Sequence, residues 1–225
     1  MPTREDDYYA GRWRDLSQLP AMRDHWWWRP GWRVGKSFYT WHITFENAPV
    51  VRELAAYYQQ QITLPTLDPV PAEGLHLTMQ GIGFTDQIPD ADITAIVNHA
   101  RDRCSALPPF TLTLGPADAD PEGAPLRIEP WAPIEQLRHT VRAAIADIWG
   151  ADRVPEPAGG FFPHVTIFYS NTDADPAPLR ARLTELRDTP PVTTTVNAIS
   201  LIRLNRDTKV YRWDTIATIP LTATT

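Results

Sequence analysis

Two short segments in which polar and apolar residues alternate place the strongest constraint on how this chain can fold. One is LHLTMQGIGF, which contains His76 and Thr78, and the other is PHVTIFYS, which contains His164 and Thr166. Successive side chains on a β-strand point to opposite faces, so each histidine shares a face with its threonine, and the apolar residues share the other. The two segments therefore predict two strands, each of which buries one face and presents a His-x-Thr pair on the other.

The repeated pair suits acid and base chemistry on an anion. One imidazole takes a proton from a nucleophile while the second gives a proton to a leaving group, and the threonine hydroxyls donate hydrogen bonds to an oxyanion such as phosphate. The alternative is that the histidines are buried hydrogen-bonded residues and the threonines only β-branched strand formers, which leaves the pairing unexplained. We therefore predict a catalytic site composed of His76, Thr78, His164 and Thr166.

Three further features accompany these motifs: a Gly-x-Gly at Gly81 and Gly83, a proline at position 163 and a terminal strand, VYRWDTIATIPL. With them the chain resembles the 2H phosphoesterase superfamily, which is named for two His-x-Thr/Ser motifs, and within it the RNA ligase-like, cyclic phosphodiesterase branch. The resemblance extends over roughly residues 38 to 220. It implies a metal-independent phosphodiesterase without a cofactor, acting on 2′,3′-cyclic phosphates of nucleotides or RNA ends.

The mechanism implied by the resemblance uses both histidines. One would deprotonate water for attack on phosphorus and the other would protonate the departing ribose oxygen, while the threonines stabilise the growing charge. The sequence leaves open which histidine is the acid and which the base. It also leaves open a non-catalytic module that binds nucleotides or RNA ends, a 2′-5′ RNA ligase-type activity, and a hydrolase for a small acyl or ADP-ribose-derived phosphate group.

The order of predicted elements indicates an α+β fold with two pseudosymmetric lobes, each an antiparallel sheet with flanking helices, around a central cleft. Each lobe is expected to offer one motif strand to the cleft, and the bilobal domain is expected to span 38–225. Strands are predicted at 38–46, 75–84, 110–115, 124–129, 163–170, 192–204 and 208–220, and helices at about 49–62, 89–105, 133–149 and 176–188.

Residues beyond the two motifs are weaker candidates for the site. A third His-x-Thr at His42 lies on the polar face of its strand and contacts substrate only if that face borders the cleft. Tyr211 and Trp213 share a face of the closing strand, where they stack on a base or pack in the core. The remaining histidines have no matched partner, and the acidic residues are expected to lie on solvated helix faces and turns. The histidines placed outside the site are His25, His99 and His139.

Residues 1–37 form an arm rich in tryptophan and arginine, with no helical or strand period. Interleaved aromatic and basic residues are typical of a platform on which single-stranded nucleic acid stacks. The alternative, which we favour, is that the arm wraps around the domain and buries its rings, because tryptophan is costly to leave in water. The tryptophans of the arm are Trp13, Trp26, Trp27, Trp28 and Trp32.

Composition narrows the choice of partners. The net charge of −6 argues against binding of duplex DNA, which needs a basic surface. No apolar run approaches a membrane span and the first residues are charged, so we expect a cytoplasmic monomer without membrane contact. Cys104 is the single cysteine, so neither an intramolecular disulfide nor a cysteine metal site is expected. The partner that the family resemblance implies is a nucleotide or RNA terminus that bears a cyclic phosphate.

Overall fold

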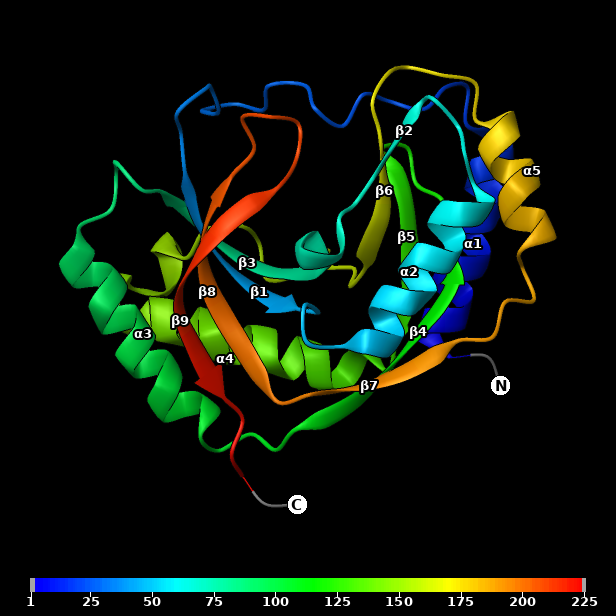
Figure 1. Ribbon diagram of the computed structural model, residues 1–225. Coiled ribbons are helices and arrows are strands. Elements are labelled where there is room, and N and C mark those ends of the chain that lie inside the picture. The colour runs from blue at the N-terminus through cyan, green and yellow to red at the C-terminus, as the bar shows by residue number, and fades with distance from the viewer. Residues whose placement is uncertain (1–2, 224–225) are drawn as a thin grey trace.

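The computed structural model describes residues 3–223, and this part of the chain contains two antiparallel β-sheets with helices around them (Figure 1). The first sheet has the order β3-β1-β8-β9 and comprises β1 (Phe38–Thr44), β3 (His76–Phe84), β8 (Ala198–Asn205) and β9 (Arg212–Pro220). The second has the order β2-β6-β5-β4-β7 and comprises β2 (Leu67–Pro69), β4 (Phe110–Ala117), β5 (Gly123–Glu129), β6 (Val165–Ser170) and β7 (Val192–Val196). The predicted α+β fold is confirmed, with one motif strand in each sheet.

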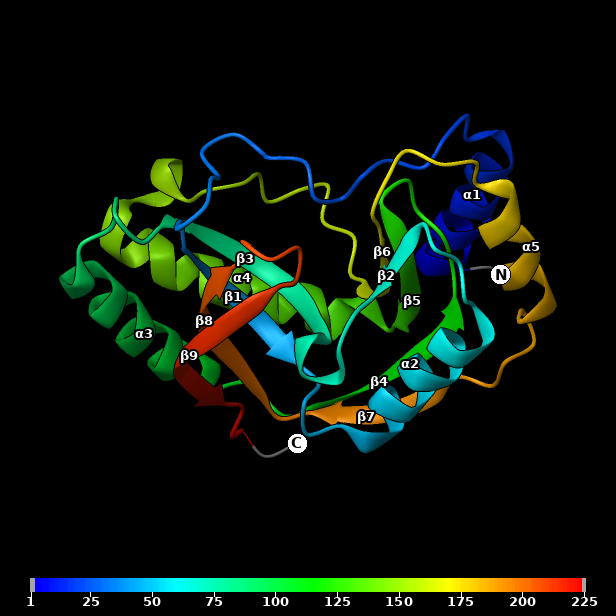
Figure 2. The same ribbon diagram turned by 45° about the horizontal axis from the view of Figure 1, so that its top comes forward.

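The helices cover the sheets unevenly. Helix α3 packs along α4 and against β9, and α4 also contacts β3, so both lie against the first sheet; α2 contacts β6 and β7 of the second. In Figures 1 and 2, α1 and α5 lie beside the second sheet. The helices are α1 (Arg4–Gln18), α2 (Pro49–Gln61), α3 (Asp90–Cys104), α4 (Trp131–Trp149) and α5 (Ala177–Glu185), with short 3₁₀ turns η1 (Ala72–Gly74) and η2 (Ala151–Arg153).

Burial of alternate residues on the motif strands orients the site. Leu77 and Met79 of β3, and Val165 and Ile167 of β6, are each at most 1% exposed and belong to one continuous core. Because neighbouring side chains on a strand alternate between faces, this burial turns the polar residues of both motifs away from the core. Apolar patterning alone therefore points the His-x-Thr pairs in their observed direction.

The single strand expected at 192–204 is wrong. The chain leaves the second sheet after β7, which pairs with β4, and enters the first sheet as β8, which pairs with β1 and β9. At the change of sheet, Asn197 contributes its carbonyl oxygen to a hydrogen bond from the Leu221 amide rather than to a neighbouring strand, at 2.8 Å. Each sheet thus takes strands from both halves of the chain, and the lobes are not its amino- and carboxyl-terminal halves.

The prediction that residues 1–37 lack regular structure is wrong, because Arg4–Gln18 form helix α1. Thr3 caps this helix by accepting a hydrogen bond from the Asp6 amide at 3.1 Å, and the Asp6 carboxylate accepts one from the Thr3 amide at 2.8 Å. This reciprocal pair satisfies two amides that have no partner within a helix. On the other side, Tyr9 and Leu16 are buried two turns apart, which makes an apolar stripe too narrow to give an obvious period.

The rest of the arm connects the two sheets. Residues 19–37 run from α1, beside the second sheet, to β1 of the first (Figures 1 and 2). Met22 and Trp26 join the hydrophobic core at 2% and 6% exposure, whereas Trp27 and Trp28 are each 48% exposed. The expected burial of the arm tryptophans is therefore confirmed for Trp26 and wrong for Trp27 and Trp28.

Candidate active site

The two motif histidines are held in the same way. His76 opens β3, and its Nδ1 lies 2.7 Å from the carbonyl oxygen of Gly74; His164 comes directly before β6, and its Nδ1 lies 2.9 Å from the carbonyl oxygen of Phe162. A carbonyl oxygen only accepts hydrogen bonds, so Nδ1 carries the proton in both rings. In the neutral ring Nε2 then has a free lone pair. Both imidazoles therefore leave Nε2 available for proton transfer.

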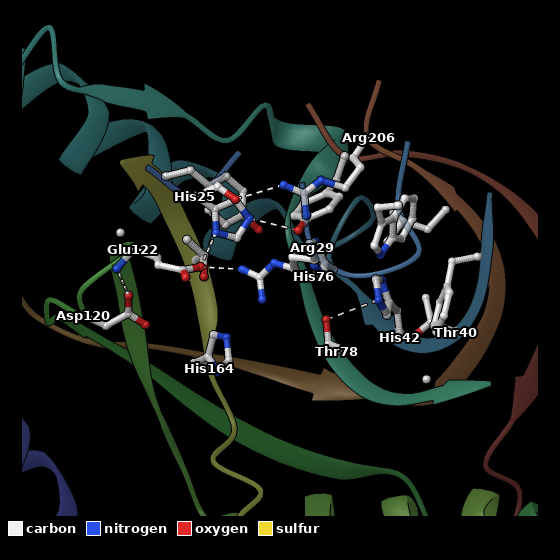
Figure 3. Close-up of a pocket in the computed structure, with 18 of the residues that line it drawn as sticks. His25, Arg29, Thr40, His42, His76, Thr78, Asp120, Glu122, His164 and Arg206 are labelled. Atoms are coloured by element: carbon white, nitrogen blue, oxygen red, sulfur yellow. Dashed lines mark hydrogen bonds and ion pairs between the residues drawn. The ribbon is translucent and has the colours of Figure 1, made fainter. Parts of the chain in front are cut away.

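All four motif residues line one cavity of about 450 Å³ (Figure 3). His76 and Thr78 reach it from the first sheet, and His164 and Thr166 from the second. Residues more than 80 positions apart in the chain are thereby placed around a single space. The structure brings together the whole set that the sequence pattern singled out, in a volume within the usual range for small-molecule pockets.

The two histidines differ in their exposure to water. His76 is 8% exposed, whereas His164 is exposed. Burial lowers the pKa of His76 to about 4, although the hydrogen bond to Gly74 opposes this, and the charges of His164 and His25 lower the pKa further. At neutral pH the His76 ring is therefore uncharged, and its Nε2 is ready to accept a proton.

His42 also lines the cavity, so its strand face borders the cleft. The side chain is 1% exposed, and its Nε2 lies 3.3 Å from Oγ1 of Thr78. Burial, together with the nearby charge of His76, lowers the pKa of His42 well below its ordinary value. Its Nδ1 is buried without a hydrogen-bond partner. His42 is thus a neutral, buried ring on β1 whose Nε2 contacts the hydroxyl of Thr78 on the neighbouring strand.

Tyr211 and Trp213 occupy different places around the histidines. Tyr211 lines the cavity, and its ring meets that of His76 edge-on, with 5.8 Å between centroids. Trp213 is half-buried and meets His42 and His76 edge-on at 5.9 and 5.5 Å, but it is not one of the cavity-lining residues. A ligand in the cavity therefore reaches Tyr211, whereas Trp213 supports the two imidazoles from outside.

The placement of His25 outside the site is wrong. This ring of the arm is 8% exposed, lines the cavity and stacks on Tyr169 with 3.9 Å between centroids. Its Nδ1 lies 3.0 Å from Oε2 of Glu122 and its Nε2 lies 2.9 Å from the hydroxyl of Tyr211. Burial lowers the pKa of His25, although the hydrogen bond with Glu122 opposes this. His25 therefore connects Tyr169 of β6 in the second sheet with Tyr211, which comes directly before β9 of the first.

The expected solvation of the acidic turn is also wrong. Glu122 lines the cavity, where burial alone would raise the pKa of its carboxyl group. The hydrogen bond from His25 and the charge of Arg29 outweigh that effect and lower the pKa to about 2, so the group stays ionised. Its partners are 97 and 93 residues away in the chain, so no local pattern signals the cluster.

Arg206 fastens the arm to the first sheet. This side chain is 3% exposed and donates hydrogen bonds to the carbonyl oxygens of His25, at 2.9 Å, and Trp27, at 3.3 Å. Its guanidinium also lies over the rings of Trp26 and Tyr211, at 5.5 and 5.7 Å from their centroids. These contacts hold the arm where its side chains line the cavity.

Other candidate sites are absent from the part of the chain that the structure describes. Within residues 3–223, no three His, Cys, Asp or Glu side chains form a cluster suited to a metal ion, and no helix is long and apolar enough to cross a bilayer. Cys104 is fully buried, and burial raises the pKa of its thiol to about 11. A thiol that stays protonated at neutral pH is a packing residue rather than a nucleophile.

Comparison with known proteins agrees with this architecture. Protein TT0787 of Thermus thermophilus has a TM-score of 0.63 at 19% identity, and the match covers 82% of this chain and 98% of that one. E. coli LigT, in its complex with 3′-AMP, also has a TM-score of 0.63, at 20% identity, with coverage of 84% and 99%. A third structure, described as a phosphoesterase, has a TM-score of 0.62 at 21% identity and the same coverage as LigT. These structures share the fold.

No curated protein matches the sequence. A family model does: that of the 2′-5′ RNA ligase superfamily matches residues 45–208, which is most of the chain and includes both His-x-Thr motifs. The amino-terminal arm lies outside the match. On the family match, the shared fold and the paired motifs, the chain belongs to the 2′-5′ RNA ligase superfamily of 2H phosphoesterases.

Proposed function

We propose that this protein is a cyclic phosphodiesterase that hydrolyses 2′,3′-cyclic phosphates of nucleotides or RNA ends. The observation that supports this most is the matched pair of hydrogen bonds from the Nδ1 atoms of His76 and His164 to backbone carbonyls. Each bond fixes a tautomer and leaves Nε2 for a proton transfer at the same cavity. Two such groups are what an in-line displacement at phosphorus requires.

The difference in burial between the two histidines supports one assignment of the acid and base roles. His76, neutral and shielded from water, takes a proton from the attacking water molecule. His164 is exposed to water, and in this proposal it gives a proton to the ribose oxygen as the phosphorus–oxygen bond breaks. One P–O bond forms, one breaks and one proton moves on each side, so the products are a phosphate monoester and a free ribose hydroxyl.

Thr78 and Thr166 bind the non-bridging oxygens in this proposal. Both line the cavity beside a motif histidine, and Thr78 is further oriented by its contact with His42. Negative charge grows on those oxygens in the transition state, so hydroxyl donors that are already in place stabilise it without reorganisation. Tyr211 offers a ring for contact with the ribose or the base.

The relatives support a nucleotide as the substrate. Structures of E. coli LigT exist with 3′-AMP, ATP, NADP⁺ and phosphate. A cavity of about 450 Å³ is adequate for a mononucleotide, and the protein's net negative charge favours a small or terminal substrate over long duplex nucleic acid.

The test is a panel of 2′,3′-cyclic nucleotides, short RNAs ending in a cyclic phosphate, and 2′-5′-linked dimers, each assayed in EDTA. We expect hydrolysis of the cyclic phosphates to continue in the chelator, because the proposed steps use only side chains. Loss of activity in EDTA that a divalent metal restores would overturn the mechanism. Tight binding without turnover would identify a binding module instead, and turnover of the dimers alone would favour ligase-type chemistry.

A further inference from the structure

From the contacts of the arm we infer that Arg29, which lies outside the residues matched by the family model, binds a non-bridging oxygen of the reacting phosphate. The inference rests on the proposed function for its substrate and adds a residue to that site. Arg29 lines the same cavity as the two motif histidines. In Figure 3 its guanidinium is drawn between Glu122 and the first motif strand, above the space that separates His164 from Thr78.

Among the described residues that line the cavity, Arg29 is the one arginine whose guanidinium is not fully occupied by other groups. Arg206 also lines the cavity, but backbone carbonyls and aromatic rings already occupy its guanidinium. The other charged lining residues are acids: Asp120 lies 3.4 Å from Arg12, Glu156 lies 3.9 Å from Arg138, and Glu122 contacts Arg29 itself. A pentacoordinate phosphate carries more negative charge than its ground state, so a cation here would add to the stabilisation given by the threonine hydroxyls.

The Arg29 guanidinium has hydrogen-bond donors that its contact with Glu122 does not use. One Nη donates to Oε2 of Glu122, whereas the buried Nε has no hydrogen-bond partner. An unpaired buried donor is costly, and native structures rarely keep one without a reason. A guanidinium presents its N–H groups as a planar fork that matches phosphate, so the Arg29 side chain has the right chemistry for an anion in the cavity. These features suit Arg29 to the binding of an anion.

The neighbours of Arg29 place it and hold it. Glu122 accepts from both Arg29 and His25, and the Trp27 ring lies 5.5 Å from the Arg29 guanidinium. Arg206 fixes the same stretch of backbone through the carbonyls of His25 and Trp27. A side chain fixed in this way loses little further freedom when substrate binds, which favours catalysis. The arm thus supplies part of the reaction site as well as covering it.

The experiment compares the full-length protein with Arg29→Ala and Arg29→Lys. Binding of inorganic phosphate is measured by calorimetry, and turnover is measured on a 2′,3′-cyclic mononucleotide with and without a 5′-phosphate. We expect Arg29→Ala to weaken phosphate binding about 10-fold and to lower kcat/KM by roughly 100-fold, mostly in kcat, as for loss of one transition-state donor. Added guanidinium ion should restore part of the Arg29→Ala rate, and Arg29→Lys should retain part of it.

Two control variants distinguish a role of Arg29 in phosphate binding from a role in holding the arm in place. Arg33→Ala removes an exposed arginine of the same arm that does not line the cavity, and it should leave affinity and rate unchanged. Glu122→Gln removes the negative charge but keeps a side-chain oxygen that can accept from Arg29 and His25, so Arg29 stays in place and phosphate binding should be kept or tightened. If the ion pair only braces the arm, Glu122→Gln and Arg29→Ala will lose activity equally, which overturns the inference.

The remaining outcomes also decide. A loss confined to the 5′-phosphorylated substrate would assign Arg29 to a second phosphate and overturn the inference as stated. Phosphate binding that depends on Arg29 in a protein without turnover would support Arg29 as the anion ligand while the proposed function fails. Unchanged affinity and rate in Arg29→Ala, or no phosphate binding by the unaltered protein, would overturn the role of Arg29.

Discussion

The imidazole rings of His42 and His76 lie parallel, with 4.4 Å between their centroids and an angle of 3° between their planes. One belongs to β1 and the other to β3, at diagonal positions of adjacent strands, since His42 pairs with Thr78 and Thr44 with His76. Stacking restricts the His76 ring to one plane and keeps water from the face that His42 covers. The contact therefore ties the burial of His76 to a neighbour outside the paired motifs.

Replacement of His42 by alanine should change how activity depends on pH. Without the stacked ring, water reaches His76, so its pKa rises from about 4 towards 6.5. Because the base must be deprotonated, kcat/KM should fall much more at pH 5.5 than at pH 8. His42→Phe, which keeps a stacked ring, is the matched control. An equal loss across the whole pH range would limit His42 to a structural role.

The two catalytic roles should separate with the leaving group. Both His76→Ala and His164→Ala should lower the rate on a cyclic nucleotide by roughly 100-fold or more. p-Nitrophenolate leaves a p-nitrophenyl phosphodiester without needing a proton. On this substrate, therefore, His164→Ala should have most of the activity of the unaltered protein, whereas His76→Ala should not. Steady-state rates of the two variants on both substrates make the comparison. Recovery by His76→Ala instead would reverse the assignment of acid and base.

Stability should fall as the pH is lowered through the range in which unfolded histidine titrates. The folded pKa of His76 is about 4, below the ordinary 6.5, so between these values the unfolded chain binds more protons and unfolding is favoured. His76 alone should lower the free energy of unfolding by about 1 kcal/mol between pH 7 and pH 5.5. Urea unfolding of the protein and of His76→Asn at both values checks this, and equal losses in the two would contradict it.

The tryptophans of the arm should contribute unequally to the stability of the protein, according to their burial. Trp26→Ala removes a ring buried in the core and should lower the free energy of unfolding by about 3 kcal/mol. Trp28→Ala removes a ring that is 48% exposed and should change it by less than about 0.5 kcal/mol. Denaturant unfolding of the two variants measures the difference, and similar losses would show that burial does not distinguish the rings.

The exposed rings also allow a test of nucleic-acid binding by the arm. We expect the double variant Trp27→Ala, Trp28→Ala to keep its preference between a cyclic mononucleotide and an RNA oligomer, because the buried part of the arm holds the cavity wall. Stacking contributes about 1–3 kcal/mol per base, so a platform would show a clear loss on the oligomer alone. Such a selective loss would mean that the arm binds RNA.

The motif strands were predictable because their signal is local. Alternation around His76 and His164 fixes which side chains are buried, and the buried set decides where the polar ones point. His42 depended on a fact that the sequence lacks, namely that the polar face of β1 borders the cavity. The alternation around His42 predicts the polar face of its strand, but what this face borders depends on the neighbouring strands β3 and β8.

The arm's part in the site was not predictable for a different reason. His25 contacts Glu122 and Tyr211, and Arg206 binds backbone carbonyls of the arm, so the partners are distant in the chain and partly main-chain atoms. A carbonyl leaves no trace in the residue sequence. Likewise the change of sheet at Asn197 follows from which strands are available to pair, not from any break in the strand pattern.

The order of strands in the first sheet has a consequence for how the molecule forms. β1 lies between β3 and β8, and β8 in turn pairs with β9, the last strand in the part of the chain that the structure describes. During synthesis the partners of β1 on one side therefore emerge long before those on the other. Pairings between residues so far apart in sequence slow folding. We expect the cavity to take shape only after β8 and β9 have been synthesised and have joined β1.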